Sequence, residues 1–348
     1  MGLRNYVAKR LAYSVVLIIL AMTVNFYIFQ IMPGDVEDLF IPPKGLPHAE
    51  YLKLVETFRH NWGLDQPLYL RYFAYLKNMF TWNFGDSILN GNAVSAEIML
   101  RMPWTLLLVG LATIMSILFG VLIGVLCAHR RGTAIDSGLL VSALILGTLP
   151  TFWLGLVFII IFTNTLGWFP SGHIYPPNWG VGSTPFPVAY TINGGTIQVN
   201  ASGALTLISG ILSHAFLPVL TLSVFLYGSY TLLTRATMID ALTEDYVVTA
   251  RAKGVGETSV LFKHALKNAS LPIITAIALA FGGLFSGAVI TETVFSWEGL
   301  GRWIYQSVVS KDFFSMQAIF FIITLCVIIA NIIADLVYGL VDPRIKYG

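Results

Sequence analysis

EDYVVTARAKGVGETSVLFKHALKNASLP, residues 244–272, is a polar segment placed between two long apolar stretches of the chain. Alanine and glycine alternate in it with apolar residues. A solvated linker between two membrane helices needs no such alternation, whereas a surface contacted by another protein does. We therefore predict that this segment is a docking site.

The segment has helical periodicity on both sides of a glycine. Tyr246, Val247 and Ala250 can share one face of a helix, and Gly254 is placed to end that helix as a C-cap does. A second helix is predicted from Thr258 towards the proline that closes the segment. Small residues at the tip of this helix–turn–helix would let a groove on another protein approach closely.

The composition of the chain is that of a polytopic membrane protein. Its 348 residues are 56% hydrophobic and 11% charged, whereas about a quarter of the residues are charged in soluble domains. The formal charge of +2 indicates little about partners, because the distribution of charge carries that information. Cys127 and Cys326 both lie in apolar stretches, so we predict buried packing residues and no disulfide or thiolate metal site.

Six apolar stretches are long enough to cross about 30 Å of hydrocarbon, which takes about 20 residues of helix. They are Leu11 to Met32, Trp104 to Ala128, Ser137 to Leu166, Phe216 to Thr234, Pro272 to Thr291 and Met316 to Ala334. The first follows basic residues as a signal peptide does, but it is longer and lacks a small-residue cleavage site, so a retained helix is predicted. The third contains Pro150 near its middle, which predicts a kink or tilt.

The distribution of Lys and Arg predicts the orientation. Short loops keep these residues on the cytoplasmic side of a membrane. They occur in the loop 129–135, in the region 235–271 and in the C-terminal tail, whereas residues 167–205 contain none. Both termini and the polar segment are therefore predicted to be cytoplasmic.

The outer segments contain further patterns. HAEYLKLVETF (48–58) and DQPLYLRYFAYLKNMF (65–80) have apolar residues at helical spacing, the latter with Asp65 as N-cap and Pro67 in the first turn. A third helix, AVSAEIMLR (93–101), runs into the second apolar stretch. We expect these helices along the membrane surface rather than in a separate soluble domain. TINGGTIQV (191–199) predicts a short hairpin, and residues 200–202 form a glycosylation sequon.

The membrane stretches contain no Asp, Glu, Lys, Arg or His between their ends. Ion-coupled transporters usually carry such residues along their pathway, so the energy for uphill transport is expected to come from outside this chain. An ion-coupled secondary carrier is the alternative class. An embedded enzyme is a third class, but the glycines of AKGVGETS lack the Lys of a phosphate-binding loop, and no metal or nucleophile motif is present.

The polar segment resembles the coupling segment of binding-protein-dependent ABC importer permeases, in particular of the dipeptide and oligopeptide branch. That branch has the pattern DYV.TARAKG followed by V...HAL.NA..P. The matching residues here are Asp245 to Gly254, Val260, His264 to Leu266, Asn268, Ala269 and Pro272. The likeness covers nearly the whole chain in the order of the family. The other matching motifs are IMPGD (31–35), GLDQPLYLRYFAYLKNMF (63–80), NFGDS (83–87), RMPWTLLL (101–108), LPTFWLGL (149–156), LPVLTL (217–222), ETVFSWEGLGR (292–302) and DLVYGLVDPRIKY (335–347).

The resemblance implies an all-α type I ABC importer permease fold with six transmembrane helices, a cytoplasmic coupling helix and both termini in the cytoplasm. Residues 1–103 would hold the N-terminal transmembrane helix and the outer amphipathic segment. Residues 104–348 would form a five-helix permease core with a coupling loop at 235–271. The chain would be the first of two permease subunits, a multi-pass protein of the cell membrane.

The partners implied are a second homologous permease subunit, two cytoplasmic ATPase subunits, an extracytoplasmic solute-binding protein and membrane lipid, with no nucleic acid. ATP and Mg would bind to the ATPase subunits, so this chain is expected to bind no cofactor and to be no enzyme. The branch imports peptides, and some relatives import oligosaccharides. Because the binding protein selects the solute, the sequence of this subunit does not separate these substrates.

The resemblance also implies site residues. Those that couple to the ATPase would be Asp245, Tyr246, Thr249, Ala250, Arg251, Ala252, Lys253, Gly254, Val255, Gly256 and His264. Residues 249–256 would sit in a groove on one ATPase, and closure of the ATPase pair would swing the membrane helices from inward-open to outward-open. The two basic residues at 251 and 253 would pair with acids on the ATPase or face anionic lipid.

A passage for solute is expected along the fifth apolar stretch, because small polar side chains suit a wide, weakly binding pathway. The candidate residues are Gly282, Gly283, Ser286, Gly287, Thr291 and Glu292. Small residues also let membrane helices pack closely, which is the alternative. For Glu292 the alternative to an outer gate is a cap on the loop to Trp297.

Overall fold

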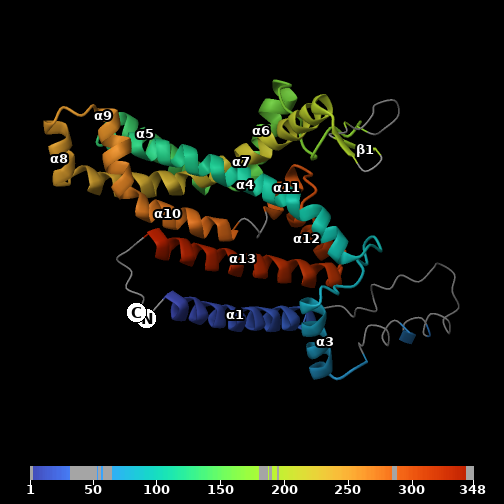
Figure 1. Cartoon of the computed structure of the whole chain (residues 1–348). Coiled ribbons are helices and arrows are strands. Elements are labelled where there is room, and N and C mark those ends of the chain that lie inside the picture. Colours follow the sequence, from blue (N-terminus) through green and yellow to red (C-terminus); the bar gives the residue numbers. More distant parts are fainter. Residues whose placement is uncertain are drawn as a thin grey trace. The chain divides into compact units, whose positions relative to one another are not determined.

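The computed structural model describes residues 3–31, 53, 56–57, 65–179, 187, 190–193, 196–283 and 288–341 (Figure 1). These residues fall into two compact units, which we describe separately. The first draws on Met1–Arg101 and Trp303–Ile332, and the second on Met102–Arg302 and Ile333–Lys346.

The described part of the chain is mostly helical. In chain order the helices are α1 (Leu3–Ile31), α3 (Leu68–Phe80), α4 (Val94–His129), α5 (Ala134–Thr148), α6 (Thr151–Phe158), η2 (Ile159–Thr165), α7 (Ala201–Leu242), α8 (Asp245–Ala252), α9 (Glu257–Ser259), η3 (Val260–Ala265), α10 (Leu266–Gly283), α11 (Val289–Val294), α12 (Leu300–Val309) and α13 (Phe313–Val341). The elements η2 and η3 are π-helical. The predicted hairpin is confirmed, because β1 (Tyr190–Asn193) pairs antiparallel with β2 (Thr196–Val199).

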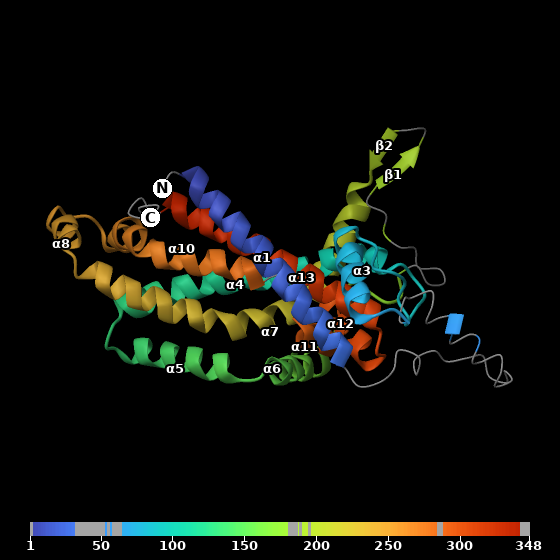
Figure 2. The same ribbon diagram turned by 90° about the horizontal axis from the view of Figure 1, so that it is seen from below.

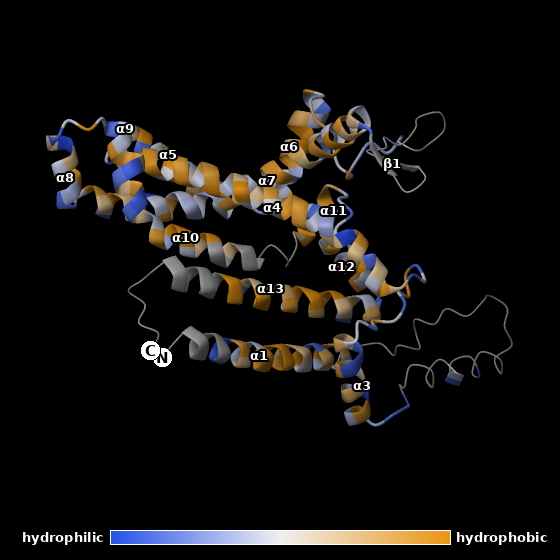
Figure 3. Cartoon of the chain, viewed as in Figure 1, coloured by the Kyte–Doolittle hydropathy of each residue, from blue (hydrophilic) through white to orange (hydrophobic). Residues whose placement is uncertain are grey.

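Within the described residues, four helices are long and apolar enough to span a membrane: α1, α4, α7 and α13. A fifth span arises if α5 and the continuous α6–η2 segment are counted together, although they are bent by 103°. Figure 3 shows apolar residues along these helices and hydrophilic residues at α8 and α9. The fifth predicted span falls on α10 and α11, and residues 284–287 between them lie outside the described residues.

The bend predicted at Pro150 is confirmed, but it is a break rather than a kink. The helix α5 ends at Thr148, and Leu149 is extended (φ −69°, ψ 137°). A residue that precedes proline is driven out of the helical region by the proline ring. Pro150 is extended as well and starts α6, where its missing N–H costs nothing.

Several predicted boundaries need correction. The helix α3 starts at Leu68 with Pro67 at the N-cap position, so the prediction of Asp65 as N-cap is wrong. The stretch 48–58 lies outside the described residues except for 53 and 56–57. The helix α4 continues unbroken from Val94 through Pro103. At the start of α7, Asn200 of the sequon accepts a hydrogen bond from the Gly203 N–H (3.1 Å) and so caps the helix.

In the first unit α3 crosses the C-terminal end of α1 (Figure 1). Thr23 Oγ1 lies 2.6 Å from Tyr72 Oη, and Asn25 Nδ2 donates to Tyr75 Oη (2.8 Å). The ring of Phe26 packs against both tyrosines, with centroids 5.3 and 5.5 Å apart. One face of α3 is therefore anchored on α1.

A neighbouring face of α3 is an exposed aromatic stripe. Tyr69, Phe73 and Phe80 follow each other at helical spacing and are 62%, 63% and 57% exposed. The Phe80 ring also contacts the Phe321 ring, with centroids 6.2 Å apart, but more than half of each of the three residues stays exposed. Such a contiguous apolar surface on a helix indicates a contact with lipid or protein.

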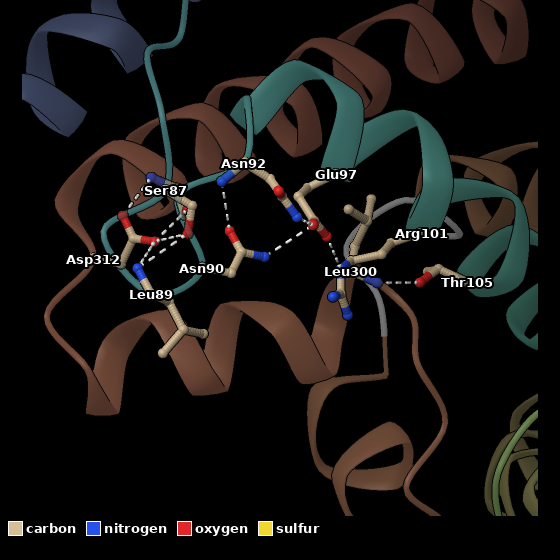
Figure 4. Close-up of polar contacts among 10 residues, drawn as sticks. Ser87, Leu89, Asn90, Asn92, Glu97, Arg101, Thr105, Leu300 and Asp312 are labelled. Carbon is tan, nitrogen blue, oxygen red and sulfur yellow. Dashed lines mark hydrogen bonds and ion pairs between the residues drawn. The ribbon is translucent and has the colours of Figure 1, made fainter.

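Two buried carboxylates hold the first unit together at its helix starts (Figure 4). Asp312 caps α13, because it accepts hydrogen bonds from Ser87 Oγ and from both the N–H (3.2 Å) and the Oγ (2.7 Å) of Ser315. Glu97, in the first turn of α4, accepts from Arg101 Nε (2.8 Å) and from two asparagine side chains, Asn90 and Asn92. Negative side chains near a helix N-terminus are favourable.

In the second unit α4 and α7 approach closely at two glycines. A Cβ on Gly124 would lie 2.6 Å from Thr234 Cβ, and one on Gly120 would lie 2.5 Å from Tyr230 Cβ. This small-xxx-small spacing lets membrane helices bring their backbones together. Cys127 is buried as predicted, whereas Cys326, in the first unit, is only partly buried and corrects that part of the prediction.

Candidate functional site

The polar segment forms two helical pieces joined by a tight turn at one end of α7. The helix α8 ends in a Schellman motif: the Gly254 N–H donates to Arg251 O (2.9 Å) and the Val255 N–H to Ala250 O (3.2 Å). Gly254 has φ +73°, a left-handed conformation that favours glycine. The predicted helix end at Gly254 is confirmed.

The side of α8 that carries the sequence pattern faces inward. Val247 and Ala250 are buried and form a cluster with Val260 of η3, against which Tyr246 and Val255 also pack. The apolar periodicity that indicated a docking face therefore marks the attachment of α8 to its own chain. Ala250 and Tyr246, which were expected to contact the ATPase, lie wholly or partly on this inner side.

The outer side of α8 carries a strip at helical spacing. Val248 is 60% exposed, and Asp245, Thr249 and Ala252 beside it are exposed as well. Sequence reasoning missed Val248, although its spacing from Asp245 and Ala252 was available as a signal. An exposed valine among small and polar residues is a surface that a shallow groove can cover.

The remaining predicted coupling residues lie around the turn. Lys253, Gly254 and Gly256 are exposed, and His264 is partly buried in η3. Behind the turn, η3 and α10 pack on α4 and α7 through an apolar cluster. Its buried members are Val125, Ala128, Met238, Ala241, Leu261, Ala265 and Ala269. The turn is thus packed against the ends of α4, α7 and α10.

Arg251 is paired within the chain rather than free. Its Nη2 donates to Glu257 Oε1 (2.7 Å) and its Nε to Glu257 Oε2 (3.2 Å). The same Oε1 lies 3.7 Å from Nδ1 of His129, the last residue of α4. The Arg251 guanidinium lowers the pKa of Glu257, so this carboxylate is ionised at neutral pH.

A second ion pair fixes the base of α7. Arg235 donates from Nε to Asp136 Oδ1 (2.7 Å) and from Nη2 to Asp136 Oδ2 (2.8 Å). The side chain of Asp136 is 3% exposed, and it also accepts from the Gly132 N–H (3.0 Å) in the α4–α5 turn. This two-point pair joins the turn to α7 seven residues before α7 ends.

Glu292 is a fully buried residue of α11 in the second unit, and its side chain lies against the start of α12. Its carboxylate accepts hydrogen bonds from Thr105 Oγ1 and from the Arg302 N–H (both 2.9 Å), while Thr105 Oγ1 accepts from the Leu300 N–H (2.8 Å). Glu292 and Thr105 thus satisfy the first free N–H groups of α12. Gly299 and Gly301 lie so close to the Glu292 carboxylate that a Cβ on either would have to displace it.

Replacing Glu292 with alanine is expected to destabilise the protein by about 3 kcal/mol, because it removes a buried acceptor and leaves the donors of α12 unpaired. Glu292→Gln keeps one acceptor oxygen and should lose less. The measurement is the thermal unfolding midpoint of the purified protein in detergent. The matched control is Glu298→Ala, since Glu298 is exposed in the same loop; equal midpoints for the two alanine variants would contradict the capping role.

The structure describes only some of the other candidate pathway residues. Gly282 and Gly283 lie in the last turn of α10, and Ser286 and Gly287 lie outside the described residues. Thr291 is buried. An apolar cavity of about 250 Å³ lies elsewhere in the second unit, between α4, α5 and α7, with Phe119, Leu146 and Phe216 among its walls. Thr291 and Glu292, the two predicted pathway residues whose side chains are described, are not among its walls.

The long apolar helices and the mounted helix–turn–helix define a membrane-embedded permease component. The chain matches the family model of the binding-protein-dependent transport system inner membrane component over residues 120–347. It also matches the model of the N-terminal region of such membrane components over residues 3–109. The chain therefore belongs to this family, and it is a multi-pass protein of the cell membrane.

Curated relatives match over the full length. The oligopeptide transport system permease protein AppB of Bacillus subtilis is 35% identical, over 98% of this chain and 99% of the relative. The di/tripeptide transport system permease protein DppB of Pseudomonas aeruginosa is 32% identical, over 99% of both chains. The glutathione transport system permease protein GsiC of Salmonella choleraesuis is 33% identical, again over 99% of both. The predicted resemblance to the dipeptide and oligopeptide branch is confirmed.

Proposed function

We propose that this chain is one of two non-identical permease subunits of an ATP-driven importer, and that it passes peptides or related oligomeric solutes from an external binding protein into the cytoplasm. ATP and Mg bind to two partner ATPase subunits, and this chain hydrolyses nothing. The observation that carries the proposal is α8: a short helix fixed to the ends of the long helices, with an exposed strip available to a partner.

The docking face on α8 is the strip of Asp245, Val248, Thr249 and Ala252, together with the turn at Lys253 and Gly254. Val248 supplies the apolar contact, and the small neighbours let the groove of an ATPase close over the helix. Because α8 is tied to α7 and through η3 to α10, a displacement of α8 is carried into the membrane helices. This is how closure of the ATPase pair would switch the permease between inward-open and outward-open states.

The topology we propose has six spans, with both termini and α8 in the cytoplasm. The placement of α8 and the β1–β2 hairpin at opposite ends of α7 supports it, since a helix that spans the membrane puts its two ends on opposite sides (Figure 2). Residues 1–103 would form the N-terminal span with its outer segment, and residues 104–348 the core. The broken pair α5 and α6–η2 and the pair α10 and α11 would count as one span each.

The aromatic stripe of α3 fits the outer membrane surface. The helix runs across the end of α1 (Figure 1), so it lies along the membrane plane if α1 spans it. Tyr69, Phe73 and Phe80 then face the boundary between head groups and acyl chains, where aromatic side chains are enriched. Exposed apolar residues of α1, among them Val24 and Ile28, would contact lipid as well.

For the solute pathway we propose the small residues Gly282, Gly283, Ser286 and Gly287 with Thr291. We assign the carboxylate of Glu292 to the cap of α12, because it accepts from the Arg302 N–H and from Thr105 Oγ1, which in turn accepts from the Leu300 N–H. The names of the relatives favour peptides as the solute class. Oligosaccharides are the alternative within the same machinery.

The proposal is tested by reconstituting the chain in proteoliposomes with the second permease and the ATPase subunits. Uptake of a labelled oligopeptide is expected only with ATP on the ATPase side and the binding protein on the opposite side. Val248→Glu should abolish this uptake, because it places a charge on the docking strip. Uptake by this chain alone, driven by an ion gradient without ATP, would instead establish a secondary carrier.

A further inference from the structure

The turn between α8 and α9 does not fix the angle between these helices by its backbone alone. It contains four residues, Lys253 to Gly256, of which two are glycines. Arg251 and Glu257 flank this turn and close it with two hydrogen bonds of 2.7 and 3.2 Å. The side-chain pair therefore determines how α8 is held against α9, in addition to the apolar contact with Val260.

We propose that Arg251 is a positioning residue that acts within its own chain: its pair with Glu257 locks α8 to α9, so that a displacement of the docking helix is delivered to η3 and α10. The proposal rests on α8 being the helix that docks to an ATPase. It assigns Arg251 neither to an acidic residue on the ATPase nor to lipid, since two of its donors are already bound to Glu257.

The connections of α8 determine which elements move with it. On one side α8 joins α7 through the two residues Thr243 and Glu244, so it follows α7 in any case. On the other side α9, η3 and α10 follow one another without a break from Glu257 to Gly283. With the Arg251–Glu257 pair closed, α8 moves together with this second element, and without the pair the two glycines absorb part of the motion.

The pair is half exposed, with side chains 45% and 40% accessible, so it contributes little to overall stability. Its loss should appear in coupling rather than in folding. The proposed readout is therefore the amount of oligopeptide taken up per ATP hydrolysed by the reconstituted importer. The thermal unfolding midpoint of each variant is measured alongside.

The test uses the charge exchange Arg251→Glu, Glu257→Arg and the double variant. Each single change is expected to lower uptake per ATP by about three- to fivefold, and the double variant should recover to within about twofold of the unmodified importer. Lys263→Glu is the matched control, since Lys263 is an exposed cation on η3 outside the docking face. It should leave uptake per ATP unchanged.

The opposite pattern would overturn the proposal. If Arg251 bound an acid on the ATPase, Arg251→Glu would fail, Glu257→Arg alone would be harmless and the double variant would not recover. Failure of the proposed function is recognised separately, because the unmodified complex would then show no ATP-dependent uptake at all. If the thermal unfolding midpoints of the variants are unchanged, neither result can be attributed to a folding defect.

Discussion

Replacing Gly254 with valine is expected to lower solute uptake by roughly tenfold while leaving the protein inserted in the membrane. Gly254 has φ +73°, and a residue with a Cβ pays about 1–2 kcal/mol in this left-handed region, with β-branched residues at the upper end. The strain opens the Schellman motif that ends α8, so the docking strip loses its orientation. Uptake and ATPase activity in proteoliposomes are the measurements.

Gly256 offers the matched control, because it lies in the same exposed turn but has φ −60°, which any residue adopts. A Cβ meets nothing within 4 Å at either glycine. Gly256→Val should therefore keep near-normal uptake, and Gly254→Asn should keep most of it, since asparagine tolerates the left-handed region. If both valine variants failed equally, the glycines would serve close approach of the ATPase instead of backbone geometry.

In the coupling segment, the helices could be predicted from the sequence, but the side of α8 that packs on the chain could not. The helix, its end at Gly254 and a second helix predicted from Thr258 follow from local propensity and turn chemistry. All are present, the second helix starting one residue earlier, at Glu257. Which side of α8 faces its own chain could not be predicted, because periodicity identifies an apolar face but not what covers it. Here Val260 of the same chain covers Val247 and Ala250.

The long helices were predictable in position but not in length. The apolar stretches predicted the positions of α1, α4, α7 and α13, but these helices continue into polar residues on one or both sides of the stretches. Glu97 and Arg101 can lie at the start of α4 because they pair at i,i+4.

The capping role of Glu292 depends on Thr105, 187 residues away, for which the sequence offers no local signal. Asp312 does carry a local signal, because it directly precedes an apolar helix and accepts from the Ser315 N–H three residues on; only its contact with Ser87 is distant.

Replacing Arg235 with alanine is expected to destabilise the protein by an amount at the lower end of about 3–5 kcal/mol. The change leaves the carboxylate of Asp136 buried, at 3% exposure, with the Gly132 N–H as its remaining described hydrogen-bond donor and Arg131 as a nearby positive charge. The value lies at the lower end because the Arg235 side chain is 26% exposed, so water can partly replace it. The thermal unfolding midpoint in detergent measures the loss.

The double variant Asp136→Asn with Arg235→Gln separates the ion pair from the rest of the turn. Removing both charges avoids an unpaired buried carboxylate, so this variant should be more stable than Arg235→Ala alone. Arg130→Ala, an exposed change in the same turn, should leave the midpoint unchanged. The pair ties the α4–α5 turn to α7 seven residues before α7 ends, through two hydrogen bonds between Arg235 and Asp136. The double variant lacks this two-point contact, so its uptake should still be lower than that of the unmodified importer. Full uptake in that variant would mean that α5 follows α7 through its apolar contacts alone.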